Sequence, residues 1–565
     1  MRETEAARIV RSSSAAAGAL AALAAAALLW PANAAAAGAP DLEIGRRLYR
    51  DGIRASGRPV KVIVAGDTEF EGTQFNCQTC HRRSGLGSFE GDVVASMVTA
   101  AALYEDKTSG PRKRRAYTDE TLARALRDGV DSDGQPFDPI MPRYELTDVE
   151  AEGLIAYLRT LSAQVSPGVT EEQLHLATVI TGDIDAGPML DVLQTFFDEK
   201  NNQRRNPEGR RKAGPFYRAN VDQAYRRWEL HPWRLTGGAA SWRAQLEEHY
   251  RQQPVFALIS GLGGDEWRPI HEFCEAHEIP CLLPNIDLPP IETGDYYSLY
   301  FSEGLTLEAR AIASQLSSGS HDRRVLQVVH PDARGETAAA ALRGALDTRA
   351  GRSVEEIRLD RQSFDAAELE RRIDASDATV VVLWLTLDEI EELAPWIALG
   401  RASAAGPRIY LSSTLTGGSP SAIPEPVRQA AHIAHPFTLD DELPSRFARA
   451  KVWLESRGIE IRDPRIQAQT YFVCMLLGEA LMHVKYDYFF RDYLIESIDH
   501  MTVLSKFSIA HPSPSFGPGQ RFISKGCYVL APAGTAADGA EDAVTWIVPG
   551  HTAPGSPVGR NRSAP

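Results

Sequence analysis

The spacing of apolar positions changes at about residue 163, and this change divides the chain into two parts. Before it, amphipathic segments with helical spacing alternate with polar loops. These segments span residues 41–52, 118–129 and 147–161. Gly52 and Gly129 end the first two, and Thr147 with Glu150 has the spacing of a capping box. We therefore predict a small all-α domain over residues 41–163.

Beyond a short linker at residues 164–169, brief apolar runs alternate with amphipathic segments. The runs that predict strands are 175–181, 228–235, 255–260, 280–284, 325–329, 355–359, 379–385 and 408–412. The helices expected between them are 188–199, 241–251, 267–278, 305–316, 337–349, 365–375 and 388–399. Such alternation is typical of parallel sheets covered by helices on both faces.

The second part is too long for one such sheet, so we expect residues 170–550 to form a two-lobed α/β domain. A further helix is expected at 464–484, and the last strands at 526–530 and 543–548. Residues 551–565 are rich in Pro, Gly and Ser, and we expect a disordered tail there.

The N-terminal 37 residues have the pattern of a signal peptide. Arg2, Arg8 and Arg11 precede an apolar run at residues 15–30, and small residues follow it. The run is short for a membrane span. We expect residues 1–37 to be removed on export, which in a bacterium leads to the periplasm. An uncleaved N-terminal anchor is the alternative.

The net charge argues against two classes of partner. The chain has 60 Lys and Arg and 75 Asp and Glu, which gives a formal net charge of −15. Such an acidic chain is poorly suited to nucleic acid or to anionic membrane surfaces. Its 43% hydrophobic and 24% charged residues are typical of a globular protein, and we expect no membrane span after removal of the signal.

One short motif carries recognisable chemistry, the stretch Cys77-Gln-Thr-Cys80-His81. Two cysteines two residues apart, followed at once by histidine, are typical of c-type haem attachment. The thiols add across the two vinyl groups of one porphyrin, and the imidazole becomes the proximal iron ligand. A redox dithiol or half of a zinc site is the alternative. Since no second Cys or His pair lies nearby, we predict one covalent haem c held by Cys77, Cys80 and His81.

Four cysteines remain outside the motif. Cys274 and Cys281 are close in sequence, and an oxidising compartment makes them a candidate disulfide. Cys474 and Cys527 could pair with each other or stay as buried thiols.

Residues 41–163 resemble a class I cytochrome c. They combine an N-terminal helix, the CxxCH motif, a Met-Pro loop at Met141 and a C-terminal helix with Tyr157 and Leu158 near its end. The resemblance implies Met141 as the second iron ligand, and a crossing of the first and last helices. Met97 is the alternative ligand, although its setting suggests a packed helix. A long insertion before Cys77 departs from the family, and residues 118–161 also resemble the cytochrome subunits of periplasmic dehydrogenases.

Residues 170–550 resemble type I periplasmic binding proteins of the branched-chain-amino-acid branch. The resemblance rests on landmarks in order, such as the strand-loop-helix from Thr181 and the strand that begins Ile279-Pro. It implies crossovers between lobes near residues 300, 435 and 530, and a ligand cleft at the carboxyl ends of strands. The cleft candidates carried over by position are Gly261, Leu262, Gly263, Asn285, Asp287, Arg334, Trp384, Ser413 and Thr414.

The same comparison argues against an amino acid as the solute. Amino-acid binders place hydroxyls and an aromatic ring where this chain has Leu262, Gly263, Ile286 and Ala333. The sequence also lacks a recognisable Ser/His/Asp or Cys/His arrangement, so we expect no catalytic residues.

These features together predict a periplasmic electron carrier fused to a small-solute-binding module. Ligation by His and Met leaves no open position on iron, which favours electron transfer over oxygen chemistry. The expected partners are a periplasmic dehydrogenase or a terminal acceptor, and an unknown small solute. The alternative is a solute-binding receptor for a transporter or sensor, in which the haem senses redox state or a gas. A third hypothesis is that the protein is a haem enzyme.

Overall fold

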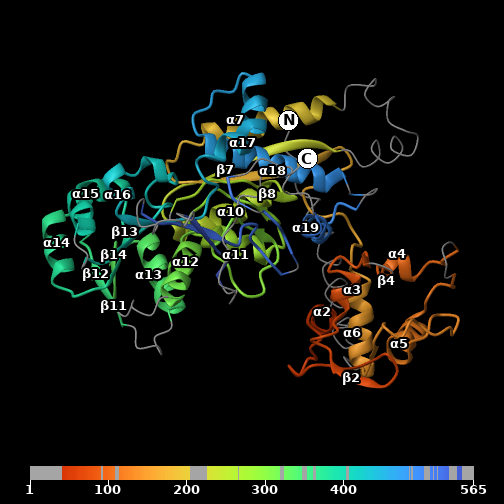
Figure 1. The fold of residues 1–565 in the computed structure, drawn as a ribbon. Coiled ribbons are helices and arrows are strands. Elements are labelled where there is room, and N and C mark those ends of the chain that lie inside the picture. The colour runs from red at the N-terminus through yellow and green to blue at the C-terminus, as the bar shows by residue number, and fades with distance from the viewer. Residues whose placement is uncertain are drawn as a thin grey trace, which may run out of the picture. The chain divides into compact units, whose positions relative to one another are not determined.

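The chain folds into two compact units, Met1–Ala163 and Gln164–Pro565 (Figure 1). The computed structural model describes residues 41–90, 93–108, 113–203, 226–264, 266–318, 324–346, 353–360, 364–402, 406–482, 484, 488–501, 510–512, 514–517, 519–532 and 544–549. The expected signal peptide at 1–37 and the expected tail at 551–565 lie outside these residues. Within them, no helix is long and apolar enough to cross a membrane.

The first unit contains the three helices that the sequence predicts. Among its described residues, the helices are α2 (Leu42–Asp51), α3 (Cys77–His81), α4 (Ala100–Leu103), α5 (Asp119–Asp128) and α6 (Asp148–Leu158). The predicted ends are confirmed. Gly52 and Gly129 close α2 and α5 in the left-handed conformation, with φ of 67° and 72°, and Thr147 and Glu150 form the capping box of α6.

The prediction of an all-α first domain is wrong, because the unit also contains two small sheets. Strands β1 (Lys61–Val64), β2 (Thr68–Glu71) and β5 (Arg143–Tyr144) form one sheet in the order β2-β1-β5. Strands β3 (Ser88–Glu90) and β4 (Val93–Ala95) form an antiparallel pair. The first sheet arises in the insertion before Cys77. There Val60, Val62 and Val64 alternate with more exposed residues and bury their side chains in the core.

The helices α2 and α6 cross in close contact at Gly45, as the resemblance implied. A Cβ atom on Gly45 would collide with the carbonyl oxygen of Gly153 and lie 2.6 Å from the Cβ of Tyr157. Next to this point the rings of Tyr49 and Tyr157 lie 5.5 Å apart between centroids. Leu48 and Leu154 complete the apolar contact on the buried faces of the two helices.

Gly45→Ala should therefore destabilise the first unit, by about 1–3 kcal/mol, because the added methyl group forces the two backbones apart. Hydrogen exchange of the backbone amides in α2 and α6 measures the change, and these amides should exchange faster in the variant. Gly344→Ala is the control, since that glycine is also helical but has open space around its Cβ position. Unchanged exchange in Gly45→Ala would show that the crossing can relax without cost.

The second unit contains two sheets, and the prediction of parallel sheets is confirmed. The first has the order β10-β9-β8-β6-β7 and is parallel throughout. Its strands are β6 (Gln173–Thr181), β7 (Arg227–Leu235), β8 (Ala257–Ile259), β9 (Cys281–Leu282) and β10 (Ser298–Leu299).

The second sheet has the order β12-β11-β13-β14-β15-β16-β17. Its strands are β11 (Arg324–Val329), β12 (Ser353–Arg358), β13 (Val380–Trp384), β14 (Arg408–Ser412), β15 (Ala431–His435), β16 (Cys527–Leu530) and β17 (Val544–Ile547). The five strands from β12 to β15 are parallel, whereas β16 and β17 pair antiparallel at one edge.

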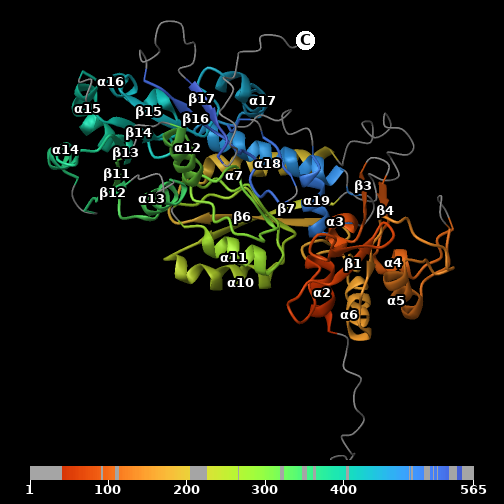
Figure 2. The ribbon, with the colours of Figure 1, turned by 60° about the horizontal axis from the view of Figure 1, so that its bottom comes forward.

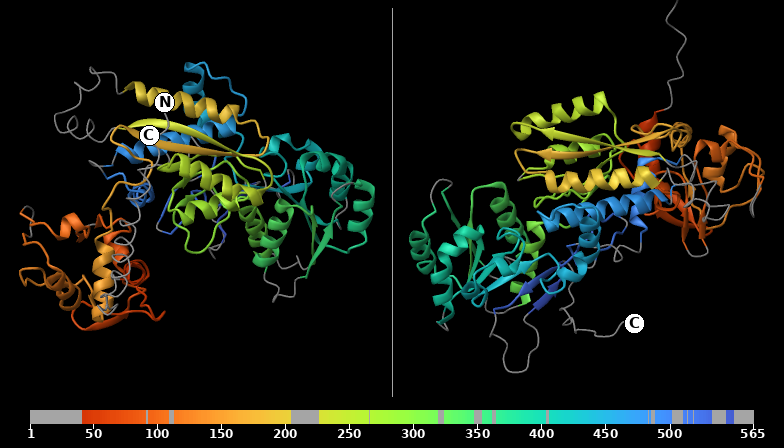
Figure 3. Two further views of the ribbon diagram at one scale, coloured as in Figure 1. Left: turned by 180° about the vertical axis from the view of Figure 1, so that it is seen from behind. Right: turned by 90° about the horizontal axis from the view of Figure 1, so that it is seen from above.

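Helices cover both faces of each sheet (Figure 2). On the first sheet, α10 (Trp242–Gln252) and α11 (Arg268–Ala276) pack on one face, and α7 (Gly187–Gln203) and α18 (Pro464–Met482) on the other. On the second sheet, α12 (Leu305–Ser318) and α13 (Ala333–Ala345) lie opposite α14 (Ala366–Asp374), α15 (Leu387–Ala402) and α16 (Glu425–Arg428). The views in Figure 3 show the same layers from behind and from above.

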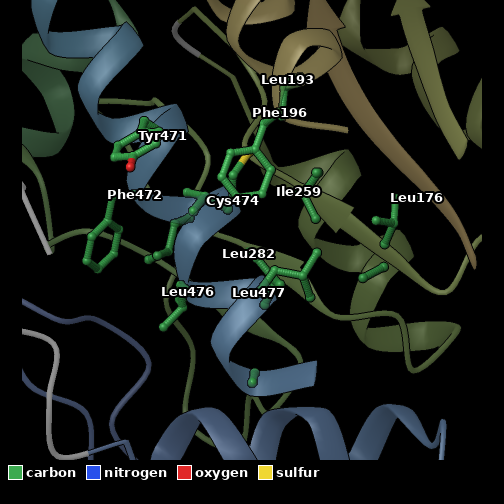
Figure 4. Close-up of a cluster of buried hydrophobic side chains, with 14 of the residues drawn as sticks. Leu176, Leu193, Phe196, Ile259, Leu282, Tyr471, Phe472, Cys474, Leu476 and Leu477 are labelled. Atoms are coloured by element: carbon green, nitrogen blue, oxygen red, sulfur yellow. The ribbon is translucent and has the colours of Figure 1, made fainter. Parts of the chain in front are cut away.

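The largest apolar cluster of the unit lies between the first sheet and the helices α7 and α18 (Figure 4). Leu476 and Leu477 of α18 and Phe196 of α7 meet Leu176 and Ile259 of the strands. Helices α17 (Leu443–Ser456) and α19 (Arg491–Asp499) extend this cluster. A segment from near the end of the chain therefore completes the core around the first strands.

Candidate functional site

The motif Cys77-Gln-Thr-Cys80-His81 forms the short helix α3. Asn76 caps its start, since the Asn76 side-chain oxygen accepts hydrogen bonds from the N–H and the hydroxyl of Thr79, at 3.1 and 2.8 Å. Cys77 and Cys80 are three residues apart on this helix, so their side chains leave from the same side. Cys77 is buried and Cys80 is exposed. This is the one-turn spacing that attachment to two vinyl groups requires.

One hydrogen bond at Nδ1 orients the imidazole of His81, and its Nε2 atom has no partner among the described residues. Its Nδ1 atom lies 2.7 Å from the carbonyl oxygen of Ser96, and a carbonyl only accepts, so Nδ1 carries the proton. The Nε2 atom is buried and has no hydrogen-bond partner among the residues that the structure describes. Burial also lowers the pKa of His81. The ring is therefore neutral at pH 7, with an unused lone pair on Nε2.

An unpaired buried acceptor costs about 1–3 kcal/mol, so a protein keeps one where something else uses it. A neutral imidazole that donates from Nδ1 to a carbonyl and offers Nε2 is the usual form of a metal-binding histidine. With two thiols on the same helix, the donor set of α3 fits a haem c.

The buried thiol of Cys77 contacts a tyrosine that follows 67 residues later in the sequence. Its sulfur lies 3.8 Å from the hydroxyl of Tyr144, which itself donates to the carbonyl of Phe75 at 2.9 Å. Burial raises the pKa of Cys77 to about 11. The thiol is therefore protonated at neutral pH in the chain without haem.

Met141 lies in a tight turn and is half-buried against the core of the first unit. Its N–H donates to the carbonyl of Asp138 at 2.9 Å.

The setting of Met97 differs from the packed helix that the sequence suggested. Met97 follows strand β4 in a loop and is 42% exposed. Its neighbour Ser96 accepts the hydrogen bond from Nδ1 of His81 through its carbonyl oxygen.

In the second unit, four of the cleft candidates lie together at the carboxyl ends of β6, β8 and β9. Leu262 bridges to Ile180 on one side and to Asn285 on the other, between Gly261 and Gly263. The side-chain amide nitrogen of Asn285 donates to the Gly261 carbonyl at 3.2 Å. Its side-chain oxygen is buried, without a partner in the described part of the chain.

The candidates Asp287, Arg334 and Thr414 lie around a residue that sequence reasoning missed, Glu308. The Glu308 carboxylate is fully buried and accepts from the N–H and the hydroxyl of Thr414, at 3.1 and 2.6 Å. Burial raises the pKa of Glu308 to about 7, and the nearby Asp287 adds to the effect. Arg334 lies 3.5 Å from Asp287. The available signal was a single acidic residue in the apolar opening of α12, Leu305-Thr-Leu-Glu308.

Two candidates are core residues in the structure. Trp384 is 1% exposed, and its indole N–H donates to the side-chain oxygen of Gln327 at 3.1 Å. Ser413 is wholly buried, with its hydroxyl 2.7 Å from Nδ1 of His435. The other nitrogen of His435 donates to the Thr438 carbonyl, and burial lowers the pKa of His435 to about 4. This Ser/His pair, unforeseen from the sequence, is thus fully enclosed in the core.

The candidate disulfide residues lie side by side on α11 and β9. Cys274 and Cys281 are both buried thiols, and the thiol of Cys281 raises the pKa of Cys274 further above its ordinary value, which burial has already raised. All six cysteines fall within the described residues, and none is in a disulfide there. Cys474 and Cys527 are also buried.

Comparison with solved structures finds substrate-binding proteins of ABC transporters. The chain is similar to a fatty acid ABC transporter substrate-binding protein from Thermomonospora curvata, with 13% identity, a TM-score of 0.44, and 68% of this chain and 94% of that one covered. It is similar to a branched-chain amino acid ABC transporter protein from Thermus thermophilus with bound valine, with 14% identity, a TM-score of 0.44, and 64% of this chain and 93% of that one covered. A leucine-binding protein from Thermotoga maritima is also similar, with 13% identity, a TM-score of 0.42, and 66% of this chain and 97% of that one covered. No curated protein matches the chain.

A family comparison concerns the first unit. Residues 63–162 match the family model of cytochrome c. The matched segment includes helix α3 with its two cysteines, the histidine with the unused nitrogen, and the Met141 turn. Residues 63–162 are therefore a cytochrome c domain.

Proposed function

We propose that the chain is a periplasmic c-type cytochrome that carries one covalent haem for electron transfer, fused to a small-solute-binding module. The observation that carries the proposal is the imidazole of His81, with Nδ1 bound to the Ser96 carbonyl and Nε2 buried without a partner in the described residues. When bound, the haem supplies a one-electron couple at its iron. Cys77 and Cys80 would hold it covalently, and His81 and Met141 would be its iron ligands.

The protein groups around the site would favour electron transfer. The Ser96 carbonyl fixes the tautomer of His81 and so keeps Nε2 available as a ligand. Met141, half-buried between Pro139 and Pro142 in a hydrogen-bonded turn, would supply the second ligand of the haem iron. Two side-chain ligands would leave no open position on the iron for a substrate. The expected electron partner is a periplasmic dehydrogenase or a terminal acceptor.

The second unit is proposed as the solute-binding module, with a type I periplasmic-binding-protein fold. Parallel α/β sheets present loops at the carboxyl ends of their strands, where ligands of such folds bind. Gly261, Gly263 and Asn285 meet at these ends on the first sheet. The side-chain oxygen of Asn285, which has no partner among the described residues, can accept a hydrogen bond from a solute. The proposed solute is a small molecule other than an amino acid. Location in the periplasm rests on the signal-like residues 1–37.

The deciding experiment compares absorption spectra of oxidised wild type, Met141→Ala and Met97→Ala. Sulfur ligation from methionine gives oxidised c-type haem a weak band at about 695 nm. We expect this band in wild type and in Met97→Ala, and its complete loss in Met141→Ala. Loss in Met97→Ala alone would reverse the ligand assignment. A wild type without the band that binds CO readily would instead favour the receptor reading, with the haem as a sensor.

A further inference from the structure

We infer that the β1–β2 hairpin is a clamp on the Met141 turn, and that Arg143 and Tyr144 are positioning residues for the axial ligand. The inference rests on the proposed ligation by Met141 and assigns a role to the insertion before Cys77. The hairpin belongs to this insertion, at residues 61–71. Its turn is tight, since Ala65 and Gly66 adopt positive φ of 49° and 102°.

The hairpin binds the Met141 turn on both sides of the methionine. Two residues before Met141, the Pro139 carbonyl accepts from the N–H of Ala65 at 2.9 Å. Two residues after it, Arg143 and Tyr144 form strand β5 and pair with Ile63 and Val62 of β1. Met141 is therefore the middle of a short segment whose two ends are fixed to the same hairpin.

The side chain of Arg143 adds a third connection to the hairpin turn. Its guanidinium donates to the carbonyl of Gly66, and it lies 3.6 Å from the carboxylate of Asp67. A hydrogen bond from a charged donor is stronger than a neutral one. Arg143 therefore holds the hairpin turn against the segment that follows Met141.

The side chain of Tyr144 connects this sheet to the haem-attachment helix. Its ring is 4% exposed in the core of the unit, and its hydroxyl donates to the carbonyl of Phe75, two residues before Cys77. Thioether bonds fix the haem to α3, so a link between β5 and Phe75 fixes the position of the Met141 turn relative to the haem. Burial raises the pKa of Tyr144 well above its usual value, and the hydroxyl thus keeps its proton at neutral and moderately alkaline pH.

The test is displacement of the methionine by added imidazole, followed at the long-wavelength methionine band of the purified, haem-loaded protein. We expect Arg143→Gln and Tyr144→Phe to show the band, with half-displacement at an imidazole concentration about tenfold lower than in wild type, as befits the loss of one hydrogen bond. Arg143→Lys keeps a charged donor and should restore most of the resistance. Haem content should stay unchanged in all three variants.

Arg127→Gln is the matched control, because Arg127 also donates to a backbone carbonyl, of Leu146, and pairs with an aspartate, Asp148, but does not touch the hairpin. Its displacement curve should coincide with that of wild type. Wild-type curves for both Arg143→Gln and Tyr144→Phe would overturn the clamp while leaving the ligation by Met141 intact. A wild type without the band would overturn the ligation itself.

Discussion

Replacing Cys77 and Cys80 together with serine is expected to leave no haem on the chain after denaturation and acid extraction, whereas wild type keeps all of it. Two thioether bonds survive these conditions, and coordination by His81 alone does not. Each single variant should keep one bond, and hence a covalently held haem with one unreacted vinyl group. The measurement is the haem absorbance that stays with the denatured polypeptide.

The chain contains a second pair of cysteines for comparison. Replacing Cys274 and Cys281 with alanine removes two buried thiols from the second unit and should leave the covalent haem content unchanged. Haem that stays on the Cys77/Cys80 double variant would contradict covalent attachment at α3. A mass that rises by two hydrogen atoms on reduction in wild type, but not in the Cys274/Cys281 double variant, would show in the same samples that these two cysteines form a disulfide.

Glu308→Gln should make the second unit more stable at pH 8, by up to about 3 kcal/mol, and should have little effect at pH 4.5. Burial raises the pKa of Glu308 from 4.5 to about 7. The unfolded chain releases its proton near pH 4.5, and the folded chain only near pH 7. Stability from this group is therefore fully present below pH 4.5 and is lost as the pH rises to 7, at about 1.4 kcal/mol per pKa unit. Glutamine has no proton to lose and can still accept from Thr414.

Urea unfolding followed by tryptophan fluorescence measures this effect in the second unit alone. Of the nine tryptophans, Trp30 precedes the first unit's helices and the other eight follow residue 163. Glu303→Gln is the control, since Glu303 lies 2.7 Å from Arg310 and its loss removes an ion pair. That variant should be slightly less stable than wild type. A Glu308→Gln variant that is less stable at pH 8 would mean that the carboxylate is charged and compensated in the native state.

The sequence predicted elements well where the physics is local. Caps and stops depend on a few neighbouring residues, so the ends of α2, α5 and α6 agree with the structure. The alternation of apolar runs and amphipathic segments likewise predicted most of the parallel strands of both sheets, although it missed β10 and β15. The strands β1 and β2 were hidden in a stretch rich in glycine. Strand β1 is stabilised by pairing with β5, about 80 residues later, and by burial of Val62, neither of which is a local property.

The candidate sites divide in the same way. The spacing of Cys77, Cys80 and His81 alone indicated a haem, because the attachment chemistry requires adjacent residues. The carbonyl of Ser96 that fixes the imidazole could not be predicted, since any backbone carbonyl can accept. In the second unit, position along a strand suggested Trp384 as a cleft residue, but its ring is buried in the sheet.

By itself, the sequence determined the haem-attachment motif, the helix ends and the parallel α/β architecture of the second unit, all of which depend on short spacing and periodicity. The tertiary structure alone decided that His81 keeps a buried nitrogen without a protein partner among the described residues, that the insertion braces the Met141 turn, and that Glu308 is buried among hydroxyl groups. These features arise from contacts between distant segments, whose burial and hydrogen bonding are fixed only when the whole unit has folded.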